Sequence, residues 1–473
     1  MSFAPFILRW RLAPDLSLAP AGDTDVTLTF PGGGTITLTP GSVGLRDALL
    51  ALVDGADEDR LLSLAGGEAA AQLFYDLARL VAGGVLEASA DLEDAPAVRL
   101  VPRSPQFEWP LPVDLPGRLT LDRFAFLRRT SRGATLQGPD AACEVAIENA
   151  HCSALIGRLA SGTVDAASLG DPLDRAFAGL LVALGFVAEP EAAESPARQT
   201  WEFHDRLFQR AVRSYRDFVP RGGTYRFTGK LPAPPAIRPA YSGTSIALPE
   251  PRRGPSSDGR TLHDVMESRR SRRDMAEQPV GLDAVGKLLH RVARITSVKP
   301  GSREFPQESL LRPYPSGGAI HELEYYLAVR ACAGLAPGFF HYRGQDHALT
   351  HIADAEAPAA AMIADCGWAW GQPERPPQVL VVIAARLPRL AWKYTGIAYK
   401  LSLLNSGVAL QSLYLAATDL GLAGSAAGSG NPDLFAQATG VSSWEETSIA
   451  EFGFGRRQDG DDLHIRRLDR SRT

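Results

Sequence analysis

Cysteine, lysine and long apolar runs are scarce in this 473-residue sequence, and each scarcity excludes a class of protein. The four cysteines show no C-x-x-C spacing, which argues against a zinc site and a disulfide framework, so we expect small buried side chains. The longest apolar stretch, Ala176–Ala188, is shorter than the roughly 18 residues of a membrane-spanning helix. The first residues lack a basic segment followed by an apolar one, so we expect no secretory signal and a cytoplasmic protein with no membrane partner.

Charge is distributed unevenly along the chain. The sequence has 49 basic and 54 acidic side chains, a net charge of −5, but residues 1–200 have a net charge of −11 and residues 201–473 a net charge of +6. An acidic region lacks the basic surface that phosphate binding requires, so we expect no nucleic acid partner. Only five basic residues are lysines, which makes a lysine within a motif less expected by chance.

The length predicts about three domains at roughly 150 residues each. Seven prolines between Leu231 and Arg260 disfavour both helix and core strand, so this tract is expected to connect an N-terminal region to a C-terminal domain. Just before it, apolar residues at helical spacing from Trp201 to Arg216 predict an amphipathic helix that packs on the C-terminal domain, with His204 as a packing residue. The expected domains are a first module over 1–110, a second, peptide-binding module over 111–195, a connecting helix and Pro-rich linker over 196–260, and a C-terminal domain over 261–473.

A weak repeat divides the N-terminal region. Leu80-Val-Ala-Gly-Gly-Val-Leu recurs 101 residues later as Leu181-Val-Ala-Leu-Gly-Phe-Val, and each copy predicts a helix closed by glycine before a short strand. A strand-like stretch and a helical stretch precede both copies, an order typical of two winged-helix-like modules. Because the region is acidic, we expect the modules to bind peptide as an added strand at a sheet edge. A structural or dimerising role is the alternative.

Common nucleotide and hydrolase motifs are absent. Gly223–Lys230 has five residues between its glycines and Leu231 after its lysine, so it is not a Walker A loop. No G-x-G-x-x-G follows a strand in a βαβ unit and no G-x-S-x-G elbow occurs, which argues against a Rossmann cofactor domain and a serine hydrolase.

Other segments have the residue types needed for chemistry. Arg269-Arg-Ser-Arg-Arg273 concentrates guanidinium groups and a hydroxyl that suit a phosphate, and the chain's last apolar strand ends in a second arginine pair. The Gly-rich turn Pro315-Ser-Gly-Gly lets backbone approach a flat ligand closely. Lys393 and Tyr394 follow a predicted buried strand at Gln378–Ala385 and precede a long helix, after which comes the small-residue loop Gly421–Gly430.

In their order and spacing, these segments resemble the SagB-type, McbC-like dehydrogenases of the nitroreductase-like flavoprotein superfamily, which oxidise azolines to azoles in ribosomally made peptides. The resemblance is carried by Trp201-Glu-Phe-His-Asp, Gly223-Thr-Tyr-Arg-Phe, Arg269-Arg-Ser-Arg-Arg, Pro315-Ser-Gly-Gly-Ala, Lys393-Tyr, Ala398-Tyr, Gly421-Leu-Ala-Gly and Gly453-Phe-Gly-Arg-Arg. It implies an α+β fold with a central, mostly antiparallel sheet flanked by helices, preceded by the two winged-helix-like modules. It also implies a homodimer that binds FMN at the subunit interface, with a precursor peptide, its leader and azoline core, and a cyclodehydratase as partners.

The resemblance also assigns cofactor-binding residues. The FMN phosphate and the pyrimidine side of the ring would be held by Arg269, Arg270, Ser271 and Arg273, completed by Arg456 or Arg457. Pro315, Ser316 and Gly317 would line the isoalloxazine from the partner chain, and Gly424 and Ser425 would lie near its N5 and O4 edge. Two residues differ from those common in the family: Met275 stands in place of an aromatic residue, and Glu322 in place of a proline. Both would lie near the flavin, so these differences concern the fit of the substrate more than the binding of FMN.

Lys393 and Tyr394 match the pair that family members use for catalysis. Azole formation removes a proton from the azoline Cα and delivers a hydride to flavin N5, so a positioned acid/base is needed. A tyrosine beside a cationic lysine can have its phenolate stabilised, which makes Tyr394 the candidate base and Lys393 its activator. The reverse assignment is equally allowed by the sequence.

Two other functions fit the same residues. One is a generic NAD(P)H-dependent nitroreductase, for which the N-terminal modules have no obvious use. The other is a non-catalytic peptide-binding scaffold whose flavin site has decayed.

Overall fold

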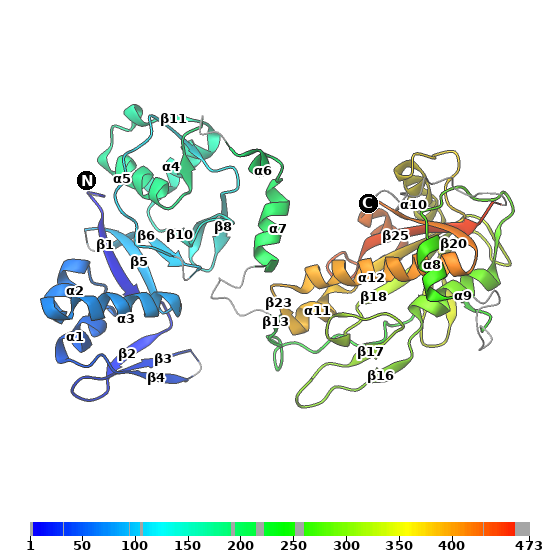
Figure 1. Ribbon diagram of the computed structural model, residues 1–473, viewed down its shortest axis with the longest axis horizontal. Helices are drawn as coiled ribbons and strands as arrows, with labels where there is room; N and C mark the ends of the chain where they lie inside the picture. Colours follow the sequence, from blue (N-terminus) through cyan, green and yellow to red (C-terminus); the bar gives the residue numbers. More distant parts are fainter. Residues whose placement is uncertain are drawn as a thin grey trace, which may run out of the picture. The chain divides into compact units, whose positions relative to one another are not determined.

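The computed structural model describes residues 3–31, 33–93, 95–104, 107–190, 194–213, 222–250, 260–428 and 430–458. The chain divides into two compact units, residues 1–219 and 220–473 (Figure 1). The boundary between the two units lies before the Pro-rich tract. Residues 231–250 of this tract therefore belong to unit 2, although we expected the tract to be a separate connection between domains. Two of its prolines, Pro251 and Pro255, lie outside the described residues.

Unit 1 is built from twelve strands and seven α-helices in its described part. The strands are β1 (Ile7–Leu12), β2 (Ser17–Pro20), β3 (Val26–Thr29), β4 (Thr35–Leu38), β5 (Leu86–Leu92), β6 (Ala95–Pro102), β7 (Arg118–Leu121), β8 (Phe126–Thr130), β9 (Gly133–Gln137), β10 (Cys143–Ile147), β11 (Val164–Asp165) and β12 (Val187–Ala188). The helices are α1 (Val43–Ala51), α2 (Glu58–Ala65), α3 (Ala70–Ala82), α4 (Ala150–Ser161), α5 (Pro172–Ala183), α6 (Pro196–Gln199) and α7 (Phe203–Arg213). The predicted helix–glycine–strand repeat corresponds to α3–β5 and α5–β12.

The two predicted modules share one six-stranded sheet, of order β1-β5-β6-β10-β9-β8. β6 and β10 pair antiparallel, with Val98 opposite Ile147, so the sheet is continuous across the expected boundary at residue 110. Apolar side chains from both halves, among them Leu77, Leu100 and Phe177, form one hydrophobic core. Unit 1 therefore folds as one body, and the winged-helix assignment of its halves stays a prediction.

Helix α7 is the amphipathic helix expected near Trp201, but its described contacts lie in unit 1. Phe203 packs edge-to-face on Phe126, with ring centres 6.0 Å apart, and Arg206 forms an ion pair with Asp140. These contacts attach α7 to unit 1, and the packing of this helix on the C-terminal domain stays a prediction. An apolar stripe at helical spacing predicts that a helix buries one face, but not which neighbour covers it. Residues 214–216, the last turn of the predicted helix, lie outside the described residues.

Unit 2 contains the remaining described elements. The strands are β13 (Gly222–Gly223), β14 (Ser245–Ala247), β15 (Val280–Gly281), β16 (Ser297–Lys299), β17 (Ser309–Leu311), β18 (Leu323–Val329), β19 (Cys332–Ala333), β20 (Gly338–Arg343), β21 (Ala348–Ile352), β22 (Val379–Ala385), β23 (Tyr394–Thr395), β24 (Leu422–Ala427) and β25 (Thr447–Arg456). The helices are α8 (Leu262–Ser268), α9 (Leu282–Ala293), α10 (Glu356–Ala369), α11 (Leu387–Lys393), α12 (Ala398–Asp419) and α13 (Pro432–Thr439).

A seven-stranded sheet of order β14-β21-β20-β18-β22-β25-β24 forms the centre of unit 2, and each of its pairings is antiparallel. Successive side chains of a strand point to opposite faces. In β22, Val381 lies in a core with α9 and α12, whereas Val382 lies in a core with α10 and α13. Both faces of the sheet are covered, which explains why β22 is continuously apolar. The α+β class and the antiparallel sheet flanked by helices are confirmed.

Arginine side chains fix the start of the Pro-rich tract to unit 2. Proline has no N–H group and cannot extend a strand ladder, so the carbonyls around it need other donors. Arg386 Nη2 donates to the carbonyl of Pro235 at 3.0 Å, and Arg389 Nη1 donates to that of Pro234 at 2.8 Å. The start of the tract is therefore part of the unit that contains Lys393.

No α-helix in the described part of the chain combines the length and the apolar character that crossing a membrane requires. Cys143, Cys152 and Cys366 are buried and Cys332 is half-buried, all as free thiols. The expectation of small buried side chains holds for three of the four.

Candidate functional site

Lys393 and Tyr394 lie where α11 ends and β23 begins, and two other predicted segments meet them there. β13 pairs antiparallel with β23 and places Gly223 opposite Tyr394. Lys393 Nζ donates a long, 3.5 Å hydrogen bond to the carbonyl oxygen of Gly318, in the Gly-rich turn. Lys393 Nζ also lies 5.6 Å from the centre of the Tyr225 ring. We call these five residues the lysine–tyrosine site.

Only glycine fits at position 318 of this site. An added Cβ would lie 2.5 Å from Lys393 Nζ and closer still to Tyr394 Oη. The backbone of Gly318 has a φ of +59°, a conformation that residues with a Cβ adopt at a cost. The turn, the amine and the phenol therefore fit together only without a side chain at this residue.

The Gly-rich turn is held from behind by Asn405 of α12. Asn405 Nδ2 donates to Ser316 Oγ at 3.0 Å, and the N–H of Gly317 donates to Asn405 Oδ1 at 3.2 Å. The same amide nitrogen lies 3.0 Å from both carboxylate oxygens of Glu322, which is buried. Burial raises the pKa of Glu322, and the Asn405 hydrogen bond opposes that shift. Pro315, the first residue of the turn, is exposed, and Gly318 of the turn lies beside Lys393 of its own chain.

Burial shifts both Lys393 and Tyr394 toward their neutral forms. It lowers the pKa of Lys393. It raises the pKa of Tyr394, and the neighbouring Tyr225 adds to that shift. Burial disfavours charge, so both equilibria are shifted toward the neutral amine and the neutral phenol.

The arginine-rich segment lies along the ends of β24 and β25. The N–H of Arg272 donates to the carbonyl of Gly424 at 3.0 Å, and the N–H of Ala276 donates to that of Arg456 at 2.9 Å. Met275 forms an isolated antiparallel bridge with Arg457. The structure thus brings together the predicted residues Arg269, Arg270, Ser271, Arg273, Gly424, Ser425, Arg456 and Arg457, which we call the arginine site.

The donors of the arginine site suit a phosphate group. Among the described residues, Arg269, Arg270 and Arg273 form no ion pair with a carboxylate. Arg270 donates to the backbone carbonyl of Glu267 at 2.8 Å, and the Arg269 guanidinium lies 5.3 Å from the centre of the Tyr414 ring. Guanidinium groups that are not paired with a carboxylate can bind a phosphate through two parallel hydrogen bonds, and the Ser271 hydroxyl can donate a further one. These residues fit the phosphate of FMN.

Sequence reasoning missed two polar residues that organise the arginine site. Gln378, just before β22, uses its whole hydrogen-bonding capacity there. Its Oε1 accepts from the backbone N–H of Val280 and Arg456, and its Nε2 donates to the carbonyls of Ala276 and Gln278. Tyr414 of α12 is the second, with its hydroxyl between Ser271 and Ser425. Neither lies in a recognisable motif, because both act through contacts distant in sequence.

A cavity of about 450 Å³ lies between α12 and the end of β24, lined by Tyr399, Leu403, Ser406, Gly407, Leu410, Ala427, Gly428, Gly430, Pro432, Ser448, Ile449, Ala450 and Glu451. Glu451 is buried, and its Oε1 has no hydrogen-bond partner among the described residues. Burial raises the pKa of Glu451 to about 7, the nearby Asp365 adds to the shift, and the N–H of Asn431 opposes it. The volume is within the range of small-molecule sites.

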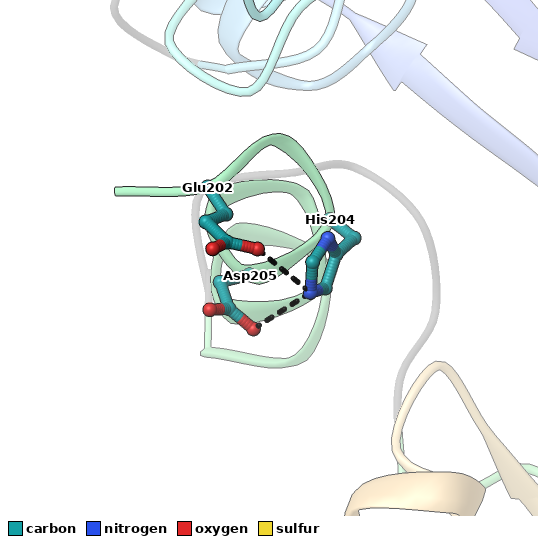
Figure 2. Close-up of side chains that lie close together, drawn as sticks. All are labelled: Glu202, His204 and Asp205. Carbon is teal, nitrogen blue, oxygen red and sulfur yellow. Dashed lines mark ion pairs between the residues drawn. The ribbon is translucent and has the colours of Figure 1, made fainter. Parts of the chain in front are cut away.

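His204 is not the packing residue that we expected. Figure 2 shows its ring at the start of α7, turned toward the carboxylates of Glu202 and Asp205, each 3.6 Å from Nε2. Its side chain is 74% exposed. Exposed acidic groups near a histidine are common on helix surfaces, and no other observation at this cluster points to a metal ion.

Comparison with known families gives two matches. Residues 266–456 match the nitroreductase family, and residues 119–217 match the cyanobactin oxidase ThcOx. Unit 2 therefore has a nitroreductase-like fold. The two matches together support an oxidoreductase.

Individual relatives are distant. A protein of Methanocaldococcus jannaschii provisionally named a nitroreductase is 27% identical over 164 residues, which cover 34% of this chain and 75% of that protein. A nitroreductase-type structure from Anabaena variabilis is 21% identical and has a TM-score of 0.36, covering 48% of this chain and 41% of that chain. The Escherichia coli microcin synthetase McbBCD complex with truncated pro-MccB17 includes a chain that is 18% identical, with a TM-score of 0.33, covering 57% of this chain and all of that chain.

Replacing Glu451 with glutamine should stabilise the protein only at high pH. The pKa of Glu451 is about 7 in the folded protein and 4.5 in the unfolded chain. Ionisation of Glu451 therefore lowers the free energy of unfolding as the pH rises from about 4.5 through 7. Glu451→Gln should therefore raise the free energy of unfolding by about 3 kcal/mol at pH 8 and leave it unchanged at pH 4.5, as measured by urea unfolding. Glu445→Gln, at an exposed position, is the control. An equal change at both pH values would contradict the assignment.

Proposed function

We propose that the protein is an FMN-dependent oxidase that converts thiazoline or oxazoline rings to thiazoles or oxazoles in a ribosomally made peptide. The observation that carries the proposal is the lysine–tyrosine site, formed by Gly223, the Gly-rich turn and Lys393-Tyr394 in a nitroreductase-like fold. The match of residues 119–217 to a cyanobactin oxidase supports a peptide substrate over a free nitro compound.

The arginine site would hold the FMN phosphate, and bound FMN would accept the hydride that leaves the azoline ring. Lys393 and Tyr394 supply the proton chemistry. Because burial lowers the pKa of Lys393 and raises that of Tyr394, we assign the base to the Lys393 amine and a hydrogen-bond donor role to the Tyr394 hydroxyl. The sequence alone allowed this assignment and its reverse equally. The ring loses one proton and one hydride, two hydrogens in total.

Unit 1 offers a groove for the peptide. β4 pairs only with β3 among the described strands, and a cavity of about 410 Å³ lies between β4 and α3, with Ile36, Leu38 and Leu80 in its wall and Asp76 and Arg79 at its polar side. Main-chain groups at a free strand edge bind an extended peptide as an added strand. We infer that this groove binds the leader segment of the precursor peptide, neutral or cationic to suit the acidic region.

A homodimer stays a prediction. Apolar side chains of α12, among them Leu403 and Leu404, are exposed in the single chain, and we infer that a second copy covers them. Sedimentation of the purified protein as a monomer would contradict this. A stable complex with a cyclodehydratase and a cytoplasmic location also remain proposals.

The function is tested by incubating the FMN-loaded protein with a synthetic thiazoline peptide in air and measuring its mass. We expect a loss of two hydrogens per ring, and about 100-fold slower oxidation by Lys393→Met and Tyr394→Phe, since a positioned acid or base contributes on the order of 10²–10⁴ in rate. Lys287→Met, at a half-exposed lysine paired with Asp283, is the control.

Two outcomes would refute this function. Lys393→Met and Tyr394→Phe proteins that retain FMN and oxidise the ring at the wild-type rate would remove the lysine–tyrosine site from the chemistry. Rapid bleaching of the flavin by NADPH with no change in the thiazoline mass would favour a nitroreductase.

Gly318→Ala should impair oxidation far more than Gly223→Ala. The Cβ at position 318 would displace both Lys393 Nζ and Tyr394 Oη, whereas one at position 223 would make ordinary contacts of 3.8 and 4.0 Å with the same two side chains. Misplacement of reactive groups by about 1 Å can cost about 100-fold in rate. Initial rates of the FMN-loaded variants give the comparison, and equal losses would show that Gly318 does not set the geometry.

Thr37→Pro should weaken peptide binding, and Thr37→Ala should not. The N–H of Phe30 donates to the carbonyl of Gly34, and the alternation of an antiparallel ladder then directs the N–H of Thr37 to the free edge of β4. Proline removes this donor, while alanine removes only the side chain. Anisotropy of a fluorescein-labelled leader peptide of a thiazole-modified precursor should show about tenfold weaker binding for the proline variant. Equal affinities would place the peptide elsewhere.

A further inference from the structure

The hydroxyl of Tyr414 connects the arginine-rich segment to strand β24. Tyr414 Oη accepts a hydrogen bond from the backbone N–H of Ala426 at 2.8 Å. It lies 3.1 Å from Ser271 Oγ and 3.5 Å from Ser425 Oγ. Three groups from two separate segments therefore meet at one phenol oxygen.

The Tyr414 ring is fixed in place by its neighbours. It packs edge-to-face on Phe452 with ring centres 5.0 Å apart, and the Arg269 guanidinium lies 5.3 Å from its centre. Aromatic pairs and guanidinium–ring contacts of this kind each stabilise one orientation of the ring. The hydroxyl is thus held at one position between Ser271 and Ser425.

The hydrogen-bonding capacity of a phenol limits what Tyr414 can do. Its oxygen has one proton to donate and accepts at two positions. Ala426 occupies one of those positions, so each serine either receives the proton or donates to the other position. Burial raises the pKa of Tyr414, but the hydrogen bonds of Ser271, Ser425 and Ala426 and the charge of Arg269 outweigh it and lower the pKa overall.

We propose that Tyr414 is a positioning residue of the FMN site, whose hydroxyl orients the Ser271 hydroxyl toward the cofactor phosphate and holds the arginine-rich segment against β24. This inference rests on the proposed function, since it needs FMN at the arginine site. Ser271 is exposed and has no other hydrogen-bond partner among the described side chains. Without Tyr414 its hydroxyl would rotate freely.

The test is a double-mutant cycle on FMN affinity. Tyr414→Phe keeps the ring packed on Phe452 and removes only the hydroxyl, and Ser271→Ala removes its partner. Each single variant should bind FMN about tenfold more weakly than the wild type, because the remaining partner loses its orientation. The double variant should bind no more weakly than the weaker single variant, since residues that act through one another are not additive.

Dissociation constants are measured by the quenching of FMN fluorescence, and the visible spectrum of the bound flavin is recorded for each variant. Tyr342→Phe is the control, because it removes the hydroxyl of a buried tyrosine elsewhere in unit 2, which is bonded to His347 at 2.9 Å. We expect Tyr342→Phe to leave FMN affinity unchanged. Thermal unfolding without FMN shows that each variant is folded.

The outcomes separate the two proposals. Wild-type protein that binds no FMN would refute the cofactor and with it this inference. Wild-type protein that binds FMN, with Tyr414→Phe binding equally well or with losses that multiply in the double variant, would refute the role of Tyr414 alone.

Discussion

The position of Lys393 depends on one buried guanidinium, that of Arg389. Arg389 lies one turn before Lys393 on α11 and is fully buried. It donates to the carbonyls of Pro234, Glu308 and Ile320, from three separate segments. Burial lowers its pKa to about 10, so the group remains charged at neutral pH. Charged donors form the stronger hydrogen bonds in a low-dielectric interior, and here they tie the Pro-rich tract and the Gly-rich turn to one helix.

The Gly-rich turn needs that support because its backbone is strained. After Gly318, Ala319 and His321 both have positive φ values, 57° and 46°. Residues with a Cβ adopt this conformation at a cost of roughly 1–3 kcal/mol each, and it persists only where the surroundings impose it. Arg389 holds the carbonyl of Ile320 between them, and Asn405 holds the N-terminal side of the turn. The strain is thus located where the turn contacts Lys393 and Tyr394.

The sequence predicted the elements and motifs themselves better than it predicted which parts of the protein they contact. Strand β22 and helix α12 were found because a continuous apolar run and a helical pattern are local features of the sequence. The arginine-rich and Gly-rich segments were found because their residue types suit a phosphate and a flat ligand. Tyr414 and Asn405 were missed because a polar residue inside a long helix has no local signature. The exposure of His204 was predicted wrongly for the same reason, since it depends on which surface covers α7.

The burial of the lysine–tyrosine site bears on how a proton would move there. A neutral amine has a lone pair to accept a proton, and a neutral phenol has a proton to donate, so the uncharged state that burial favours is the one in which Lys393 is a base and Tyr394 a donor. Accepting the proton creates an ammonium group. That cation would lie beside the carbonyl of Gly318 and 5.6 and 5.2 Å from the ring centres of Tyr225 and Tyr394. A carbonyl dipole and two aromatic faces stabilise a positive charge without neutralising it. These contacts would therefore offset part of the cost that burial places on the ammonium group.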